Sequence, residues 1–211
     1  MTAGKRLFDI VLALLLAFPV VPLTALVALA VLIVDGRPIL YVSERMRSPD
    51  RAFGLVKFRT MRSDPDDSGV TGGGKAERIT RTGRWLRRTR LDELPQLWNI
   101  LRGDMSFVGP RPPLRTYAER FPDLYAEVLT CRPGVTGLAT LIFRDHEARL
   151  LAACTTVGET DAVYARRCVP RKARIDLIYR TNRSLALDLW IIGRTLGQLI
   201  RPRQASAARG R

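Results

Sequence analysis

The segment IVLALLLAFPVVPLTALVALAVLIV, residues 10–34, decides the fold class of this chain. Its 25 residues include one polar side chain, a threonine. At about 1.5 Å per residue, a straight helix of this length would exceed the ~30 Å hydrocarbon core of a bilayer, so we expect it to lie in a membrane. A cleaved signal peptide is the alternative, since Lys5 and Arg6 precede the run and Ala28-Leu29-Ala30 forms a small-x-small site. The apolar run continues beyond that site to Val34, which disfavours cleavage.

Two prolines, Pro19 and Pro22, lie near the middle of this segment. Each removes a backbone donor and clashes with the preceding turn, so together they predict a sharp bend. Basic residues flank both ends, which allows both ends to face the cytoplasm. These residues are Lys5, Arg6, Arg37, Arg45 and Arg47. A helix that enters the membrane, breaks at the prolines and returns to the same face satisfies both observations, and a kinked spanning helix is the alternative.

Composition limits the partners and the number of domains. With 35 Lys and Arg against 20 Asp and Glu, the formal charge is +15, so we expect an anionic partner: nucleic acid, acidic lipid or nucleotide. Three cysteines without a CxxC pair and one histidine disfavour a zinc site or a disulfide framework and predict free thiols.

We divide the 211 residues into a membrane helix at 1–36, one domain at 37–201 and a basic, disordered tail at 202–211. Within that domain, the apolar pattern of residues 184–200 predicts a helix that lies in the membrane interface or covers the core.

The sequences ILYVSERM at 39–46 and FGLVKFRTM at 53–61 predict a β-hairpin. Lys57 and Arg59 lie two residues apart and so share a strand face, where they could hold phosphate; a solvated strand face is the alternative. The segment SDPDDSGVTGGGKAE at 63–77 predicts a mobile loop beside a site. It matches GxxxxGK at Gly69, Gly74 and Lys75, but Ala76 replaces the magnesium-binding Ser or Thr, so we reject a nucleotide phosphate loop.

The segment LDELPQLWNILRGDMSFVGPRP at 91–112 holds an acidic pair. Pro95 favours a helix that begins just after Asp92, which places Asp92 near the N-cap and Glu93 in the first turn. Helix capping alone accounts for both acids. The alternative is a site: among so many arginines the Asp92 carboxylate should stay ionised, which suits a nucleophile or a metal ligand. Arg111 and Arg132, each in a turn rich in proline and glycine, would then stabilise a transferring phosphoryl group.

Four of these stretches resemble the bacterial sugar transferase family, the monotopic phosphoglycosyl transferases. They are KRLFDIVLALLL near the N-terminus, KFRTM at 57–61, the block at 91–112 and RPGVTG at 132–137. The resemblance is colinear from about residue 4 to residue 201. It implies a mainly helical α+β monotopic membrane protein with an N-terminal re-entrant helix, a small β-hairpin and interfacial helices.

The resemblance also implies an activity. A UDP-sugar would give its sugar-1-phosphate to a carboxylate of the enzyme, releasing UMP, and undecaprenyl phosphate, a polyprenyl phosphate, would then accept it. This is the first membrane-committed step of polysaccharide or glycoconjugate assembly, which implies downstream glycosyltransferases as partners. The expected location is the bacterial inner membrane, with the catalytic domain at 37–201 on the cytoplasmic face.

Residue roles follow from the resemblance position by position. Asp92 would be the nucleophile, and Asp92 and Glu93 would bind Mg²⁺. Phosphate contacts would come from Lys57, Arg59, Arg111 and Arg132. Asp176, in RIDLIYR, matches an acidic position near the site, and Pro22 matches the break of the re-entrant helix.

Two departures from the family pattern limit the prediction. Val21 stands where the family has serine, and LATLIFRDHEARLLAACTT at 138–156 replaces a stretch that begins with tryptophan, so the sugar is not predicted. Two other functions remain open: a non-enzymatic, membrane-anchored basic adaptor and a glycosyltransferase that releases UDP. The chain lacks the aromatic and basic alternation of RNA-binding domains, so we expect no nucleic acid partner.

Overall fold

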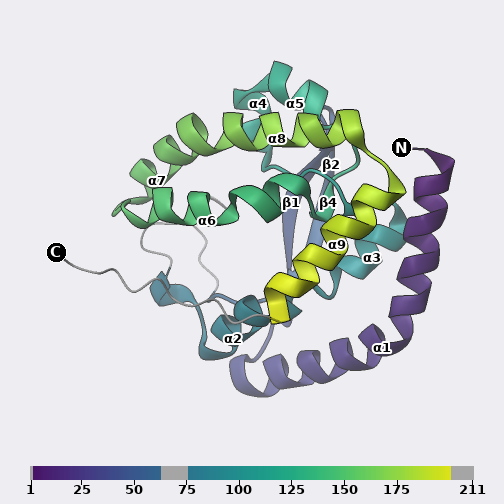
Figure 1. Ribbon diagram of the computed structural model, residues 1–211. Coiled ribbons are helices and arrows are strands. Elements are labelled where there is room, and N and C mark those ends of the chain that lie inside the picture. Colours follow the sequence, from purple (N-terminus) through teal and green to yellow (C-terminus); the bar gives the residue numbers. More distant parts are fainter. Residues whose placement is uncertain (1, 63–75, 201–211) are drawn as a thin grey trace.

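The computed structural model describes residues 2–62 and 76–200 of the chain, and the fold is mainly helical α+β, as predicted (Figure 1). The helices are α1 Ala3–Asp35, α2 Arg81–Thr89, α3 Gln96–Arg102, α4 Arg115–Arg120, α5 Pro122–Val128, α6 Leu138–Ala152, α7 Val157–Val163, α8 Val169–Asn182 and α9 Leu185–Ile200. The strands are β1 Leu40–Ser48, β2 Arg51–Phe58, β3 Ser106–Val108 and β4 Gly134–Thr136. The near match to a phosphate loop at Gly69, Gly74 and Lys75 and the tail at 202–211 lie outside the described residues.

Helix α1 bends sharply in the middle, as its prolines predict (Figure 1). The helix is continuous from Ala3 to Asp35, so the expected break at Pro22 is a bend within one helix. Thr24 supports the bend because its hydroxyl donates to the carbonyl of Val20 at 2.7 Å, a bond that is common in curved helices. By length and composition α1 could cross a membrane: its most apolar window has a mean hydropathy of 2.7 and is only 11% buried.

The N-terminal end of α1 is fixed to the rest of the chain by buried charge. Lys5 Nζ donates to Asp188 Oδ2 of α9 at 2.7 Å, and the side chains are 13% and 1% exposed. The hydroxyl of Tyr179 donates to the other carboxylate oxygen of Asp188 at 2.7 Å. Asp9 is fully buried and accepts from the Ser106 hydroxyl at 3.1 Å, which joins α1 to β3.

Arg6 joins the same end of α1 to α3. Its guanidinium donates to the carbonyls of Ile100 at 2.6 Å and Leu101 at 2.7 Å, at the C-terminal end of a helix, where carbonyls lack intrahelical partners. Lys5 and Arg6 were interpreted from the sequence as charges that flank a membrane segment. In the structure both groups are used to hold α1 against the domain.

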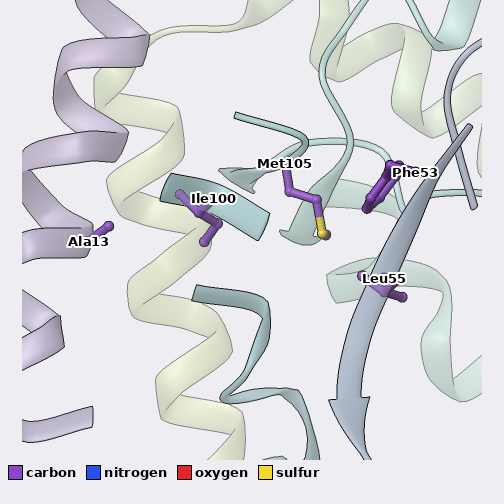
Figure 2. Close-up of a cluster of buried hydrophobic side chains, with 5 residues drawn as sticks. All are labelled: Ala13, Phe53, Leu55, Ile100 and Met105. Carbon is purple, nitrogen blue, oxygen red and sulfur yellow. The ribbon is translucent and has the colours of Figure 1, made fainter. Parts of the chain in front are cut away.

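Strands β1 and β2 form the predicted antiparallel hairpin, which packs against α3. Buried Asn99 of α3 completes the free edge of β2: its side chain accepts from the Val56 amide at 3.1 Å and donates to the Gly54 carbonyl at 2.8 Å. Figure 2 shows the apolar cluster that joins these elements, with side chains from α1, β2, α3 and the loop after α3. Its members are Ala13, Phe53, Leu55, Ile100 and Met105.

Helix α9 covers the core with one face and exposes apolar side chains on another, so it fits both alternatives that its sequence left open, a helix over the core and a helix in the membrane interface. Asp188 and Ile191 are buried against the domain, whereas Leu189 and Trp190 are 56% and 50% exposed. Trp85 of α2 and Trp98 of α3 are also exposed, so all three tryptophans of the chain lie at the surface. Exposed tryptophan is typical of the interface between a membrane and water, which fits helices that lie along that plane.

Candidate active site

The acidic pair lies in a short 3₁₀ turn, Leu91–Glu93, between α2 and α3. Arg90, which ends α2, has a φ of 61° and turns the chain into this segment. Helix α3 starts only at Gln96, with Pro95 at its N-cap position. The prediction that Asp92 caps this helix was therefore wrong, because the 3₁₀ turn is inserted before the helix begins.

Asp92 is the buried member of the pair and is only 8% exposed. Its Oδ1 atom is buried and has no hydrogen-bond partner in the described part of the chain. Burial raises the pKa of this carboxyl and Glu93 raises it further, while Lys57, Arg90 and Arg87 act in the opposite direction. The cations therefore favour the ionised form, as the sequence predicted, but they only partly offset the effect of burial on the pKa of Asp92.

Glu93 links the turn to the GPRP loop. Its Oε1 atom lies 3.0 Å from the guanidinium of Arg90 and 3.6 Å from that of Arg111. Arg111 is therefore next to the acidic pair, as the sequence predicted.

The RPGVTG segment positions Arg111 through its backbone. Strand β4 pairs in parallel with β3, in the register Ser106↔Gly134 and Val108↔Thr136. The Gly134 amide then donates to the carbonyl of Pro110, the residue before Arg111, at 2.9 Å. A Cβ atom on Gly134 would overlap the backbone nitrogen of Gly109, so glycine allows the two motifs to lie in contact.

Lys57 lies on the other side of the pair, near Asp92. Burial lowers the pKa of Lys57 to about 8, and Arg45 and Arg111 lower it further. Arg45 was missed as a site residue, although the hairpin register could have indicated it. Tyr41 pairs directly with Lys57, and Arg45 lies four residues after Tyr41 on the same strand, so Arg45 and Lys57 share one face of the hairpin. Arg87 was missed too; it lies near Asp92 and donates to the Thr60 hydroxyl at 3.0 Å.

The ammonium of Lys57 could hold a phosphate, so we predict that the affinity for a nucleoside diphosphate, with UDP as the probe, falls as the pH rises through about 8, where Lys57 loses its proton in the free protein. Phosphate prefers the ammonium form, so the affinity should fall by up to about tenfold per pH unit above that value. Calorimetric titration of UDP between about pH 7 and 9 measures this fall. The Lys57→Arg variant keeps its charge throughout and should flatten the profile. The same steep fall in that variant would contradict a role for Lys57.

Two of the predicted phosphate ligands lie elsewhere. Arg59 follows the end of β2, and its guanidinium donates to the carbonyls of Asp35 at 2.6 Å and Gly36 at 2.9 Å, at the C-terminal end of α1. Arg132 lines a second cavity, beside Lys5 and Asp188. Strand alternation could not show this, because Arg59 lies beyond the strand and the side chain of Arg132 leaves on the side away from Arg111.

A cavity of about 350 Å³ is lined by Arg90 and Arg111, the two arginines next to Glu93, although the acidic pair itself does not line it. Arg45, Arg90 and Arg111 line it near the pair, and α6 and α8 line its other side. Its further polar or aromatic residues are Tyr117, Tyr125, Thr140, Arg144, Glu147, Tyr164, Lys172 and Asp176.

Asp176 lies in this cavity together with Arg111, as the sequence predicted. Burial raises its pKa to about 7, while Lys172 and the backbone of Ala139 act in the opposite direction. Its Oδ1 atom is buried without a hydrogen-bond partner among the described residues. A molecule in the cavity could satisfy this oxygen only after a small movement of the side chain, because the atom is buried.

The divergent segment at 138–156 contains all of α6 and supplies Thr140, Arg144 and Glu147 to the wall of the cavity. Glu147 is held in place by Lys172, whose ammonium lies 2.9 Å from its carboxylate. The part of the chain that departs from the family pattern thus forms one wall of the cavity.

The acidic pair fits a hard divalent cation. Within residues 2–62 and 76–200, no group of three or more His, Cys, Asp or Glu side chains could hold a metal ion. Mg²⁺, however, commonly takes one or two carboxylates and completes its shell with water and substrate phosphate. The unpartnered Oδ1 of Asp92 beside Glu93 provides such a partial site.

The fold and the site together define a class of protein. It is a mainly helical protein with a long, exposed apolar helix, and its site combines two carboxylates with several cations beside a cavity, which suits the chemistry of phosphate esters. The sequence model of the family described as "Bacterial sugar transferase" matches residues 1–202. The chain therefore belongs to the bacterial sugar transferase family, which confirms the resemblance seen in its motifs.

Individual relatives are named for their donors and acceptors. The chain is 34% identical over 209 residues to an undecaprenyl-phosphate glucose phosphotransferase of Komagataeibacter xylinus, covering 95% of this chain and 36% of that protein. It is 38% identical over 201 residues to a UDP-glucose:undecaprenyl-phosphate glucose-1-phosphate transferase of Caulobacter vibrioides, covering 93% and 69%. An N-acetylgalactosamine phosphotransferase of Aeromonas hydrophila is 31% identical over 203 residues, covering 93% and 43%. The chain thus spans between about a third and two thirds of the length of these relatives, which differ in the sugar they are named for.

Proposed function

We propose that this protein is a phosphoglycosyl transferase that moves a sugar-1-phosphate from a UDP-sugar to undecaprenyl phosphate. One observation carries the proposal: a buried carboxylate, Asp92, has an oxygen without a hydrogen-bond partner among the described residues, and it lies near Lys57 and next to Glu93, whose partner Arg111 lines a cavity. The family and the names of the relatives support the same reaction.

The reaction runs in two displacements. The Asp92 carboxylate attacks the sugar-bearing phosphorus, the bond between that phosphorus and the bridging oxygen breaks, and UMP leaves with that oxygen and its electron pair. A phosphate oxygen of the polyprenyl phosphate then attacks the same phosphorus and frees Asp92. The product is a polyprenyl diphosphate sugar.

Cations near Asp92 stabilise the charge that develops on the phosphoryl oxygens. Lys57 and Arg111 hold the diphosphate, and Arg45 adds a third positive charge from β1. Asp92 and Glu93 would hold Mg²⁺, which when bound neutralises phosphate charge. Asp176 and α6 contact the sugar or the nucleoside.

Membrane placement follows from α1. With the bend at Pro19 and Pro22 in the hydrocarbon layer, both ends of α1 lie at one surface, and we infer that this is the cytoplasmic face of the bacterial inner membrane. Glycosyltransferases that extend the lipid-linked sugar would act next. Labelling of single cysteines placed at Thr2 and Arg37 in sealed vesicles tests this placement, since a spanning helix would expose the two positions on opposite sides.

The nucleotide released tests the reaction. Purified protein with Mg²⁺, undecaprenyl phosphate and a panel of UDP-sugars should release UMP with one or a few sugars, and chromatography of the nucleotides identifies it. Release of UDP would instead indicate ordinary glycosyl transfer. An absence of turnover with every sugar, together with salt-sensitive binding to polyanions, would favour a basic adaptor.

A further inference from the structure

A second cavity, of about 100 Å³, lies apart from the candidate active site and shares no lining residue with the larger cavity. The N-terminal end of α1, the segment before β4 and the start of α9 line it. Among its lining residues are Lys5, Arg132, Arg183 and Ser184. None of the proposed steps of the transfer reaction uses this cavity.

The positive charge of this cavity is only partly compensated. Lys5 is paired with Asp188, but Arg132 makes no hydrogen bond or ion pair in the described part of the chain. Among the described residues, Arg183 has one side-chain hydrogen bond, to the sulfur of Cys131 at 3.8 Å. Burial lowers the pKa of Arg132, and the nearby cations Arg47 and Arg6 lower it further, while Asp9 and Asp104 act in the opposite direction. A bound anion would relieve this repulsion.

The surroundings of the cavity are apolar on the side of α1 and α9. Leu185, which lines the cavity, is 45% exposed, and Leu7 on the first turns of α1 is 64% exposed. Figure 1 shows that the N-terminus of α1 lies close to the start of α9, at the end of α1 opposite to α2. Arginines at the base of an apolar helix lie at the level of lipid headgroups when that helix enters a bilayer.

We propose that this cavity binds the phosphate group of an anionic phospholipid, with Arg132 and Arg183 as its cationic ligands and the acyl chains along the exposed faces of α1 and α9. A free phosphate would satisfy the arginines but gain nothing from the apolar flanks. The acceptor polyprenyl phosphate must reach Asp92, at the other site. The proposal concerns lipid binding and does not depend on the transferase activity.

Native mass spectrometry of the full chain in detergent, without nucleotide, tests the site. The probes are dioleoyl phosphatidylglycerol and dioleoyl phosphatidylcholine, which share acyl chains and differ in headgroup charge. One phosphatidylglycerol should bind more tightly than phosphatidylcholine. The double variant Arg132→Gln/Arg183→Gln should weaken phosphatidylglycerol binding by at least about tenfold and leave phosphatidylcholine binding unchanged, since two charge-assisted contacts are lost.

The matched control is Arg149→Gln/Arg171→Gln, which removes the same charge from exposed positions on α6 and α8. This control variant should bind phosphatidylglycerol as tightly as the unchanged protein. If both double variants lost the same affinity for phosphatidylglycerol, the binding would come from the overall positive charge, and the proposed site would be wrong. Arg183→Gln alone changes an exposed residue, so it keeps the test valid if the double variant does not fold. Displacement of the lipid by inorganic phosphate alone, or a preference for undecaprenyl phosphate that the double variant abolishes, would also overturn the proposal.

Discussion

Replacement of Asp92 by asparagine is expected to abolish transfer while leaving the fold intact. The amide keeps the shape of the side chain but cannot attack phosphorus, and loss of a nucleophile commonly lowers turnover by roughly 10⁴-fold or more. Release of UMP measures the loss. Mass spectrometry of protein incubated with the UDP-sugar alone should find an added phosphosugar in the unchanged protein and none in Asp92→Asn.

The melting temperature of the Asp92→Asn variant distinguishes a loss of catalysis from a loss of folding. Because burial raises the pKa of Asp92, its ionised form is less favourable in the folded protein than in water, so a neutral amide should leave the melting temperature unchanged or raise it. The control is Asp123→Asn at an exposed position on α5, which should retain full activity. Appreciable UMP release by Asp92→Asn would remove the nucleophile assignment and leave Asp92 as a metal or phosphate-positioning residue.

Replacement of Asp188 by alanine should strongly destabilise the protein. Lys5 is 13% exposed and would lose its partner at 2.7 Å, keeping Asp9 at 3.7 Å, and Tyr179 would lose the closer of its two acceptors. Removing one partner of a buried ion pair typically costs about 3–5 kcal/mol. For a chain of this size that corresponds to a fall of roughly 10 °C in melting temperature, measured by thermal unfolding in detergent.

A second variant shows whether the ion pair itself is responsible. Lys5→Met/Asp188→Leu removes both charges, and the Tyr179 hydroxyl can then turn to the Val108 carbonyl, 3.3 Å away. Part of the lost stability should return, because neither Lys5 nor Asp188 is then left as a charge without its partner. The recovery should be incomplete, because fully buried Asp9 loses the ammonium 3.7 Å away. If the double variant were less stable than Asp188→Ala, the loss could not be attributed to the unpaired Lys5.

The parts of this structure that depend on local pattern could be predicted from the sequence. The apolar run with its two prolines gives the bent α1, and alternating residues on both sides of Pro49 and Asp50 give the hairpin. Lys57, Arg111 and the acidic pair are brought together as the motifs indicate. Several charges gathered at one place suit the binding of a phosphate group.

Long-range contacts could not be predicted. Lys5 meets a residue 183 positions away, and nothing in the flanking charges distinguishes it from a lysine that faces lipid. Arg59 follows the spacing of Lys57 but holds the end of α1. The raised pKa of Asp92 depends on how much solvent the surrounding elements exclude, which the arginines next to it in the sequence do not reveal.

Arginines hold both ends of α1 to the domain that carries the acidic pair. Arg6 joins the first turns of α1 to α3, just after the acidic pair, and Arg59 joins its last turn to the strand that carries Lys57. In the proposed placement, with both ends of α1 at one surface, a thicker or thinner bilayer would change how deeply the bend penetrates but not the distance from the headgroups to Asp92. An acceptor phosphate presented at that level would then meet the same geometry whatever the length of the isoprenoid chain that anchors it.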